Sequence, residues 1–243
     1  MSSSKQIAVL YHIFYEDTIL HIVEQLKVLE SFNPIYLFNI SADAPDQVEI
    51  RNMLQQHFTD AVIITTSNQG KDIGAKLSLI HTCLRLNIEP GWLIFLHDKK
   101  SHQALNASTW KEDLMTIIDP QNIDKIKGLI NENTNYGIVA PEKQVKEETI
   151  ENGNFINTNS AILQQLLIEY KVAPKDFRFV AGTMFWARAS AYLNFFKTHD
   201  PLAIRSTLEK GNVVDDFSGT HTHSWERLLS WIPSSQGYTI KTI

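Results

Sequence analysis

The amino-acid sequence predicts an α/β protein with a mostly parallel, Rossmann-like central sheet flanked by helices. Two observations support this fold class. Short apolar runs of strand character alternate along the chain with segments whose apolar residues recur at helical spacing, which is typical of parallel sheets. The apolar run from Trp92 to Leu96 then stops abruptly at the polar sequence His97-Asp98-Lys99-Lys100-Ser101. Such an ending is expected where the carboxyl end of a strand opens onto a ligand crevice.

The first half of the chain is expected to contain three successive steps of strand and helix before that run. Asp17 or Thr18 can cap the first helix, which Asn33-Pro34 ends, and Asp43 with Pro45 opens the second. Pro90-Gly91 ends the third helix. The expected strands are Ile7 to Phe14, Ile35 to Ile40, Ala61 to Thr66 and Trp92 to Leu96. The expected helices run through Ile19 to Leu29, from Asp43 and Pro45 through Val48 to Phe58, and from about Ile73 to Ile88.

The second half is expected to be richer in helix. Its predicted helices are Leu114 to Ile118, Ile123 to Ile130, Ile162 to Tyr170, one containing Tyr192 to Phe196, and His223 to Leu229; its predicted strands are Gly137 to Ala140, Phe177 to Ala187 and Tyr238 to Ile243. The polar segment from Glu142 to Thr158 shows no period. We interpret it as a mobile loop that covers a site, with a plain solvated loop as the alternative.

Composition sets the broad class. With 243 residues, 43% of them hydrophobic, the chain has enough apolar material for a sizeable core, and we expect one domain over residues 1–243. A net charge of -5 argues against nucleic acid as a partner. The single cysteine, Cys83, lies in a helical pattern and is expected to pack in the core, in a reducing compartment. No apolar stretch reaches the roughly 18 residues of a membrane span, so we expect a cytoplasmic protein whose membrane association, if any, is peripheral and at the inner face.

The loop from Asn68 to Gly74 follows the third predicted strand and opens a helix. It brings glycines and unpaired helix amides to a place where an anion or a nucleotide can approach closely. Plain turn geometry accounts for the glycines equally well. The loop matches neither the phosphate-cradling nor the dinucleotide-binding glycine pattern, so those nucleotide folds are not indicated.

Several motifs in a fixed order resemble the rhamnan synthesis protein F-like family of glycosyltransferase-type domains. The resemblance extends from Asn68 to Leu228. It rests on Asn68, Gly70 and Asp72; on His97, Lys99, Lys100 and Ser101; on Trp110 with Leu114; on Gly137 to Pro141; on Gly182-Thr183-Met184-Phe185-Trp186; and on His223-Ser224-Trp225-Glu226-Arg227-Leu228.

The resemblance implies a single GT-A-like domain that transfers a sugar, often rhamnose, from a nucleotide-sugar donor to a cell-surface polysaccharide or other glycan acceptor. Residues 1–101 are then the donor-binding half and residues 102–243 the acceptor-side half. The substrate-binding residues expected on this basis are Asn68, Gly70, Lys71, Asp72, His97, Asp98, Lys99, Lys100, Ser101, Thr183, Trp186, His223 and Arg227.

The chain departs from the usual GT-A pattern at the residues that bind metal. That pattern has an Asp-x-Asp after an apolar strand, whereas this chain has His97 and Lys99 at the two corresponding places. A protonated lysine cannot ligate a cation, but it can neutralise diphosphate oxygens itself. We therefore predict donor binding by Lys99 and Lys100 without a divalent metal or other cofactor. His97 either hydrogen-bonds a phosphate or caps the strand end.

An inverting transferase needs a general base for the acceptor hydroxyl, and a carboxylate usually serves. Glu226 is the favoured candidate and Asp216 the second; an ion pair that fixes the helix is the alternative role for Glu226. Arg227 either clamps donor phosphate or bridges to acids. Of Phe185 and Trp186, which alternate along a strand, one is expected to line the cleft while the other packs.

Two other functions remain open from the sequence. The fold can serve as a non-catalytic module that binds carbohydrate or a partner, because fold does not fix activity. A weaker alternative is a metal-dependent hydrolase, since His221 and His223 form an H-x-H pair that Asp215, Asp216 and His97-Asp98 could complete.

Overall fold

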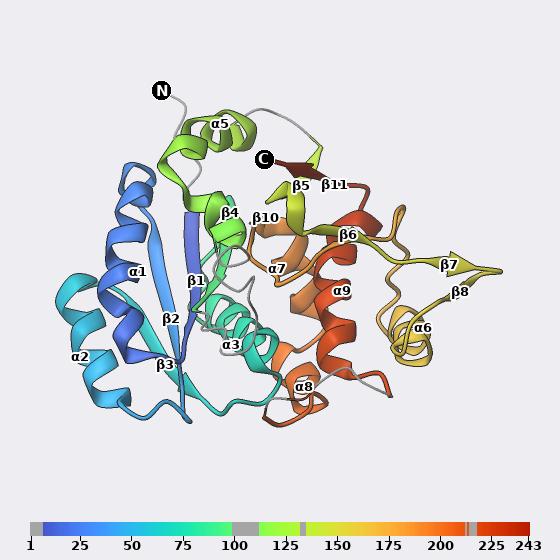
Figure 1. The fold of residues 1–243 in the computed structure, drawn as a ribbon, viewed down its shortest axis with the longest axis horizontal. Helices are drawn as coiled ribbons and strands as arrows, with labels where there is room; N and C mark the ends of the chain where they lie inside the picture. The colour runs from blue at the N-terminus through green and yellow to red at the C-terminus, as the bar shows by residue number, and fades with distance from the viewer. Residues whose placement is uncertain (1–6, 99–111, 132–134, 212, 214–217) are drawn as a thin grey trace.

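A computed structural model describes residues 7–98, 112–131, 135–211, 213 and 218–243 of the chain (Figure 1). Four of the predicted site residues, Lys99, Lys100, Ser101 and Asp216, lie outside the described residues, as does Asp215. The predictions made for them therefore stay predictions.

The centre of the molecule is a seven-stranded sheet with the order β11-β5-β10-β4-β1-β2-β3. Its neighbouring strands pair in parallel except at β10, which runs antiparallel to both β4 and β5. The mostly parallel α/β sheet predicted from the sequence is thereby confirmed. The strands are β1 (Ile7–Ile13), β2 (Ile35–Ser41), β3 (Val62–Thr66), β4 (Trp92–His97), β5 (Tyr136–Ala140), β10 (Phe185–Arg188) and β11 (Thr239–Thr242).

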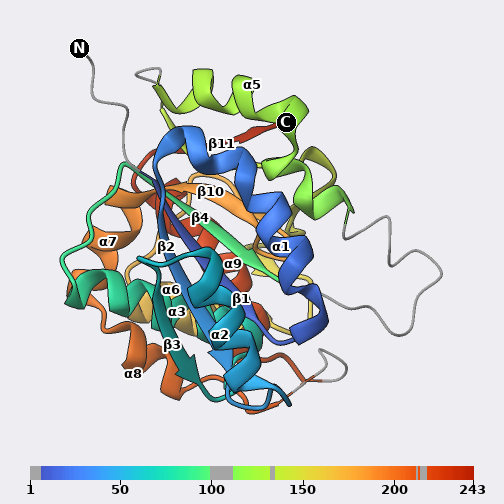
Figure 2. The same cartoon turned by 90° about the vertical axis from the view of Figure 1, so that its left-hand side faces the viewer.

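Helices cover both faces of this sheet (Figures 1 and 2). Because side chains alternate along a strand, Val9 and Tyr11 enter one apolar core while Ala8 and Leu10 enter the other. One core is completed by α1 (Ile19–Leu26), α2 (Gln47–His57) and α5 (Pro120–Asn131). The other is completed by α3 (Lys71–Arg85), α6 (Ser160–Glu169), α7 (Ala189–Thr198), α8 (Pro201–Ser206) and α9 (His221–Ser235). Cys83 is fully buried in the second core, as predicted.

The predicted strand from Phe177 to Ala187 is in fact two strands in different sheets. β9 (Arg178–Val180) pairs with β6 (Val145–Glu147), whereas β10 belongs to the central sheet. The break occurs because Gly182 and Thr183 have φ values of 77° and 50°, and two left-handed residues in succession cannot continue a strand. Gly182 and Thr183 therefore form a turn between β9 and β10.

The segment from Glu142 to Thr158 is not the irregular loop that the sequence predicts. It contains a short 3-10 turn, η4 (Glu142–Gln144), strand β6, and a hairpin of β7 (Ile150–Glu151) with β8 (Asn154–Phe155). The pairing of β6 with the distant β9 leaves no local period in the sequence, which is why it was missed. In Figure 1 the hairpin projects away from the central sheet.

Smaller differences concern the helices. The first one ends as an α-helix at Leu26 and continues as a 3-10 helix, η2 (Lys27–Phe32), until Asn33 adopts a left-handed conformation. The short helix expected after Leu114 includes a 3-10 turn, η3 (Thr116–Ile118). Within the part of the chain that is described, no helix combines the length and the apolar character needed to cross a bilayer.

Candidate functional site

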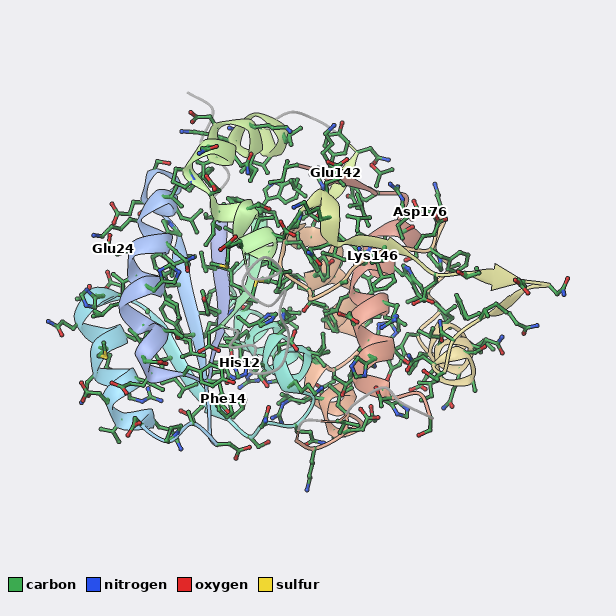
Figure 3. All side chains as sticks on the ribbon, viewed as in Figure 1. His12, Phe14, Glu24, Glu142, Lys146 and Asp176 are labelled. Atoms are coloured by element: carbon green, nitrogen blue, oxygen red, sulfur yellow. The ribbon has the colours of Figure 1, made fainter. Side chains whose placement is uncertain are left out.

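A row of polar side chains crosses the carboxyl ends of the parallel strands, on the face that α3 covers. His12 of β1 pairs with His97 of β4 on one side and with Asn39 of β2 on the other, so all three point to the same face. Thr66, at the end of β3, donates a 2.9 Å hydrogen bond to Oδ1 of Asn39. His12, Asn39 and His97 are buried, and Figure 3 labels His12 on β1. The apolar interior of the sheet thus gives way to polar groups where a ligand crevice is expected.

His12 is a neutral member of this row. Its Nδ1 lies 3.0 Å from Nδ2 of Asn39 and 3.2 Å from the Asn39 carbonyl oxygen. Burial lowers the pKa of His12 to about 4, which the charge of Asp72 only partly opposes. The imidazole is therefore uncharged near neutral pH and acts as a hydrogen-bonding group.

Above this row, α3 contributes a buried ion pair. The Nζ of Lys76 lies 2.7 Å from Oδ2 of Asp72 and 3.4 Å from Nδ1 of His97. The Lys76 side chain is fully buried, whereas that of Asp72 is 24% exposed. Burial alone raises the pKa of Asp72, but the positive charge of Lys76, aided by His97 and by hydrogen bonds, outweighs it and holds the pKa well below its usual range. Asp72 is therefore a permanent anion at physiological pH.

The turn between β9 and β10 joins this ion pair to α9. Thr183 donates its hydroxyl to Oδ2 of Asp72 at 2.7 Å, and the backbone N–H of Gly182 donates to Oε1 of Glu226 at 2.8 Å. Thr183 is fully buried and, at φ 50°, occupies a conformation that is uncommon for a β-branched residue. Strain of this kind is found where the surroundings hold a residue in place, often at functional sites.

Glu226 differs in character from Asp72. Burial raises the pKa of Glu226, and the hydrogen bond from Gly182 and the charge of Arg227 oppose that shift without cancelling it. A carboxylate with a raised pKa suits a general base that must exchange a proton near neutral pH. The site therefore combines one carboxylate that stays ionised with one whose proton affinity is increased.

The guanidinium of Arg227 contacts two carboxylates, as its predicted role of a bridge to acidic residues requires. Its Nε lies 2.6 Å from Glu148, its Nη1 lies 2.9 Å from Glu226, and its guanidinium stacks 4.5 Å from the ring centroid of Phe179. The Glu148 and Arg227 side chains are only 7% and 14% exposed. The two carboxylates neutralise the cation, and Arg227 in turn holds Glu226 in place. We therefore assign Arg227 to this bridge and not to a phosphate.

Asp98 ties two strand ends together. Its carboxylate accepts the backbone N–H of Phe14 at 2.9 and 3.0 Å and that of Tyr15 at 2.7 Å, together with the hydroxyl of Thr18 at 3.2 Å. The residue is buried. Because both oxygens are used by the segment that follows β1, which Phe14 marks in Figure 3, we assign Asp98 to holding β1 and β4 in register at the site and not to the substrate.

Neither aromatic residue of β10 faces a cleft. Phe185 and Trp186 are both fully buried, on opposite faces of the sheet, in the two different cores. The indole N–H of Trp186 donates to the carbonyl of Ile117 at 2.9 Å. The expectation that one of the two rings lines the cleft is therefore corrected, because both faces of the sheet are covered at this strand.

The loop from Asn68 to Lys71 is packed against the segment that precedes α9. Gly70 N–H donates to the carbonyl of Glu209 at 2.8 Å, the Asn68 carbonyl accepts from Gly211 at 3.3 Å, and the Lys71 ammonium donates to the Val213 carbonyl. Gly70 has a φ of 73°, and a Cβ there would lie 2.3 Å from Cδ1 of a neighbouring leucine. The glycine thus serves a close turn, and Lys71 binds the chain itself.

The same segment fixes the start of α9. The carboxylate of Glu209 accepts the backbone N–H groups of His221 and Thr222 at 2.7 and 2.9 Å. His223 is bound to the hydroxyl of Thr220, at 2.6 Å. Among the described residues, no three His, Cys, Asp or Glu side chains are grouped as metal ligands. The structure thus places His221 and His223 at the helix start, each with a partner from the protein.

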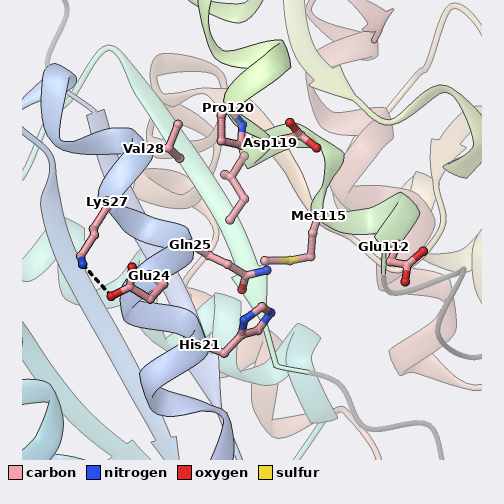
Figure 4. Close-up of a pocket in the computed structure, with 10 residues that line it drawn as sticks. His21, Glu24, Gln25, Lys27, Val28, Glu112, Met115, Asp119 and Pro120 are labelled. Atoms are coloured by element: carbon pink, nitrogen blue, oxygen red, sulfur yellow. Dashed lines mark hydrogen bonds and ion pairs between the residues drawn. The ribbon is translucent and has the colours of Figure 1, made fainter.

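A cavity of about 920 Å³ lies elsewhere, on the side of α1 (Figure 4). It opens between α1 and the segment from Glu112 to Pro120 and is lined by both apolar and charged groups, among them Met115, Glu24 and Lys27. None of the predicted site residues that the structure describes lines it.

Sequence reasoning missed several residues of the site, of which Lys76 is the most important. One signal for it was available. Lys76 is a charged residue among the apolar positions Ile73, Leu77 and Ile80 of one helix, four residues after Asp72, a spacing that brings opposite charges together. His12, Asn39, Glu148 and Glu209 had no comparable signal, because distant segments determine their roles.

The chain is similar to one protein family and to several solved structures. The model of the family described as rhamnan synthesis protein F matches residues 1–238. No curated protein matches the chain. Fourteen chains of solved structures match, among them the mannosyltransferase PcManGT from Pyrobaculum calidifontis in complex with GDP-Man and Mn²⁺. It is 13% identical, with a TM-score of 0.42, over 98% of this chain and 55% of that one. The chain thus spans about half the length of that mannosyltransferase.

Proposed function

We propose that this chain, which belongs to the rhamnan synthesis protein F family, is a glycosyltransferase that moves a sugar from a nucleotide-sugar donor to a glycan or polysaccharide acceptor. The observation that carries the proposal is that two neighbouring residues of one turn bind two carboxylates: Thr183 binds Asp72 and Gly182 binds Glu226. Asp72 lies near His97, at the carboxyl end of β4. A permanent anion beside a carboxylate of raised pKa suits a reaction in which one group binds hydroxyls and the other removes a proton.

In this proposal Glu226 is the general base. It accepts the proton of the acceptor hydroxyl as that oxygen attacks the anomeric carbon of the donor sugar, and the nucleoside diphosphate leaves with the electrons of the broken glycosidic bond. Arg227 and Gly182 hold the carboxylate in place through its two oxygens. The proton lost by the acceptor ends on Glu226, so charge and atoms balance without a covalent enzyme intermediate.

The leaving diphosphate needs positive charge, and we propose that Lys99 and Lys100 supply it. Both follow Asp98 directly in the sequence, and the hydrogen bonds of Asp98 hold the end of β4 against the segment that follows β1. Fixed ammonium groups stabilise the negative charge that develops on a leaving group. We propose that no divalent metal is required, with residues 1–101 binding the donor and residues 102–243 serving the acceptor in a GT-A-like domain.

The family description supports rhamnose as the transferred sugar and a polysaccharide as the acceptor. We propose a 6-deoxyhexose donor of this kind, used in the cytoplasm at the inner face of a membrane.

Calorimetric titration with a panel of nucleoside diphosphates and nucleotide-sugars tests the proposal. We expect at least one nucleotide-sugar and its nucleoside diphosphate to bind in the presence of EDTA, with affinity that falls as salt rises. A K99A/K100A variant should lose this binding, whereas Lys125→Ala, an exposed lysine of α5, should keep it. Indifference to every nucleotide would favour a non-catalytic binding module, and binding restored only by Mn²⁺ or Mg²⁺ would overturn metal independence.

A further inference from the structure

The carboxylate of Asp72 is used unevenly by the protein. Oδ2 accepts from the Lys76 ammonium and the Thr183 hydroxyl, each at 2.7 Å, and lies 3.7 Å from Nδ1 of His97. Among the residues that the structure describes, Oδ1 has no hydrogen-bond partner, and the side chain is 24% exposed. One oxygen is therefore anchored inside the protein, whereas the other has a lone pair that no described residue uses, on a side chain that is partly exposed.

The anchoring of Asp72 is costly, which argues that its orientation matters. Lys76 is fully buried, and removing an ammonium from water is strongly unfavourable unless geometry and hydrogen bonds compensate. Thr183 adds backbone strain to place its hydroxyl on the same oxygen. Lys76 and Thr183 together hold the charge of Asp72 and the direction of its free oxygen.

The position of Asp72 indicates which part of a substrate that oxygen meets. Thr183, which binds Asp72, directly follows Gly182, which binds Glu226, and the charge of Asp72 acts on Glu226. A general base must contact the acceptor hydroxyl, whose oxygen attacks the anomeric carbon of the transferred sugar. A group held by the neighbouring residue of the same dipeptide therefore lies close to that sugar. A diphosphate is repelled by a fixed anion, whereas sugar hydroxyls donate to it.

We propose that Asp72 binds hydroxyl groups of the transferred sugar through Oδ1, with Lys76 and Thr183 as its positioning residues. This inference rests on the proposed glycosyltransferase function and names the substrate group that the open oxygen recognises. Asp72 then discriminates a nucleotide-sugar from its nucleoside diphosphate, since the latter lacks those hydroxyls. In this proposal, neither the diphosphate nor the nucleobase of the donor contacts Asp72.

The test compares the affinity for a nucleotide-sugar with that for its nucleoside diphosphate, by calorimetric titration of the wild type and Asp72→Asn. We expect the variant to bind the nucleotide-sugar about ten- to a hundredfold more weakly, as for loss of a hydrogen bond to a charged group, and the nucleoside diphosphate within about twofold of wild type. Unchanged affinity for both ligands would overturn this inference and leave the proposed glycosyltransferase function standing. Equal weakening for both would assign Asp72 to the nucleotide and also overturn it.

The positioning residues are tested by the same ratio of affinities, which general damage to the fold would not change selectively. Lys76→Met should weaken nucleotide-sugar binding while sparing the nucleoside diphosphate. If Lys76→Met does not fold, Thr183→Val decides: it should show the selective loss, and Thr183→Ser, which keeps the hydroxyl, should restore wild-type affinity. Equal behaviour of the valine and serine variants would overturn the positioning role. If the wild type binds no nucleotide at all, the proposed function itself is wrong. This outcome differs from every result described for the Asp72, Lys76 and Thr183 variants.

Discussion

Thr183 and Asp72 are 111 residues apart in the sequence, yet the hydroxyl of Thr183 lies 2.7 Å from Oδ2 of Asp72. This hydrogen bond joins the start of α3 to the turn before β10, and through Gly182 it reaches Glu226. The two carboxylates thereby share one rigid support.

The contribution of Asp72 to the free energy of unfolding should decrease at acid pH. Its folded pKa is lowered, so its stabilising contribution is present above the unfolded value of about 3.9 and is lost as pH falls below it. We expect Asp72→Asn to lower the free energy of unfolding by about 1–3 kcal/mol at pH 7, because Lys76 loses its charged partner. Urea unfolding should show this difference unchanged down to about pH 5 and shrinking below about pH 4. A difference that stays constant into the acid range would contradict the assignment.

Glu226 should set the acid limb of the activity profile. A general base works only when ionised, and the pKa of Glu226 is raised by burial. We therefore expect kcat/KM for the nucleotide-sugar to fall with acid through an apparent pKa above the usual glutamate value of about 4.3. The profile is measured with saturating acceptor and a pH-independent detection of the released diphosphate. A profile that is flat down to pH 4 excludes a base of this kind.

Gly74 should be intolerant of a side chain. A Cβ at this position would lie 1.8 Å from the carbonyl oxygen of Gln69, within the loop that leads into α3. We expect Gly74→Ala to destabilise the protein by at least about 1–3 kcal/mol, because the backbone must shift. Gly128 in α5 is the matched control, since nothing lies within 4 Å of a Cβ there. Gly128→Ala should stabilise by about 0.5–1 kcal/mol in the same thermal unfolding measurement. Similar changes in stability for both variants would show that a side chain at position 74 does not clash with the Gln69 carbonyl.

Glu209 should stabilise the start of α9. Burial alone raises the pKa of Glu209, but hydrogen bonds from Thr222 and His221 outweigh it and lower the pKa to about 2. The contribution is therefore present above the unfolded value of about 4.3 and is lost as pH falls toward about 2. We expect Glu209→Gln to cost about 1–2 kcal/mol at pH 7, as for loss of a helix cap. Glu49→Gln, at an exposed position of α2, should stay within about 0.5 kcal/mol of wild type. Equal effects of the two variants would remove the capping role.

Much of the sheet could be predicted from the sequence because buried parallel strands are continuous apolar runs. The bounds of β1, β2, β3 and β4 each lie within one residue of the predicted bounds. The break within the predicted strand from Phe177 to Ala187 could not be seen. A threonine carries no sequence signal for a left-handed conformation, which Thr183 adopts because Asp72 and the surrounding core hold it there.

The candidate site divides in the same way. The loop at Asn68 and the residues Asp72, Thr183 and Glu226 could be identified from motif order, and the structure brings the last three together. The partners that set their charge could not. Lys76 depends on the contact of α3 with β4, and Glu148 reaches Arg227 across 79 residues. Such contacts arise from tertiary packing and leave no period in the chain.

The central claim is that Glu226 removes the acceptor proton in a nucleotide-sugar-dependent transfer. Measuring nucleoside diphosphate release together with donor affinity, for the wild type and Glu226→Gln, tests it most directly. We expect both proteins to bind the donor with equal affinity, and release by the variant to fall by about 10²- to 10⁴-fold. Release at the wild-type rate by Glu226→Gln, or no release by the wild type from any nucleotide-sugar, would contradict the account.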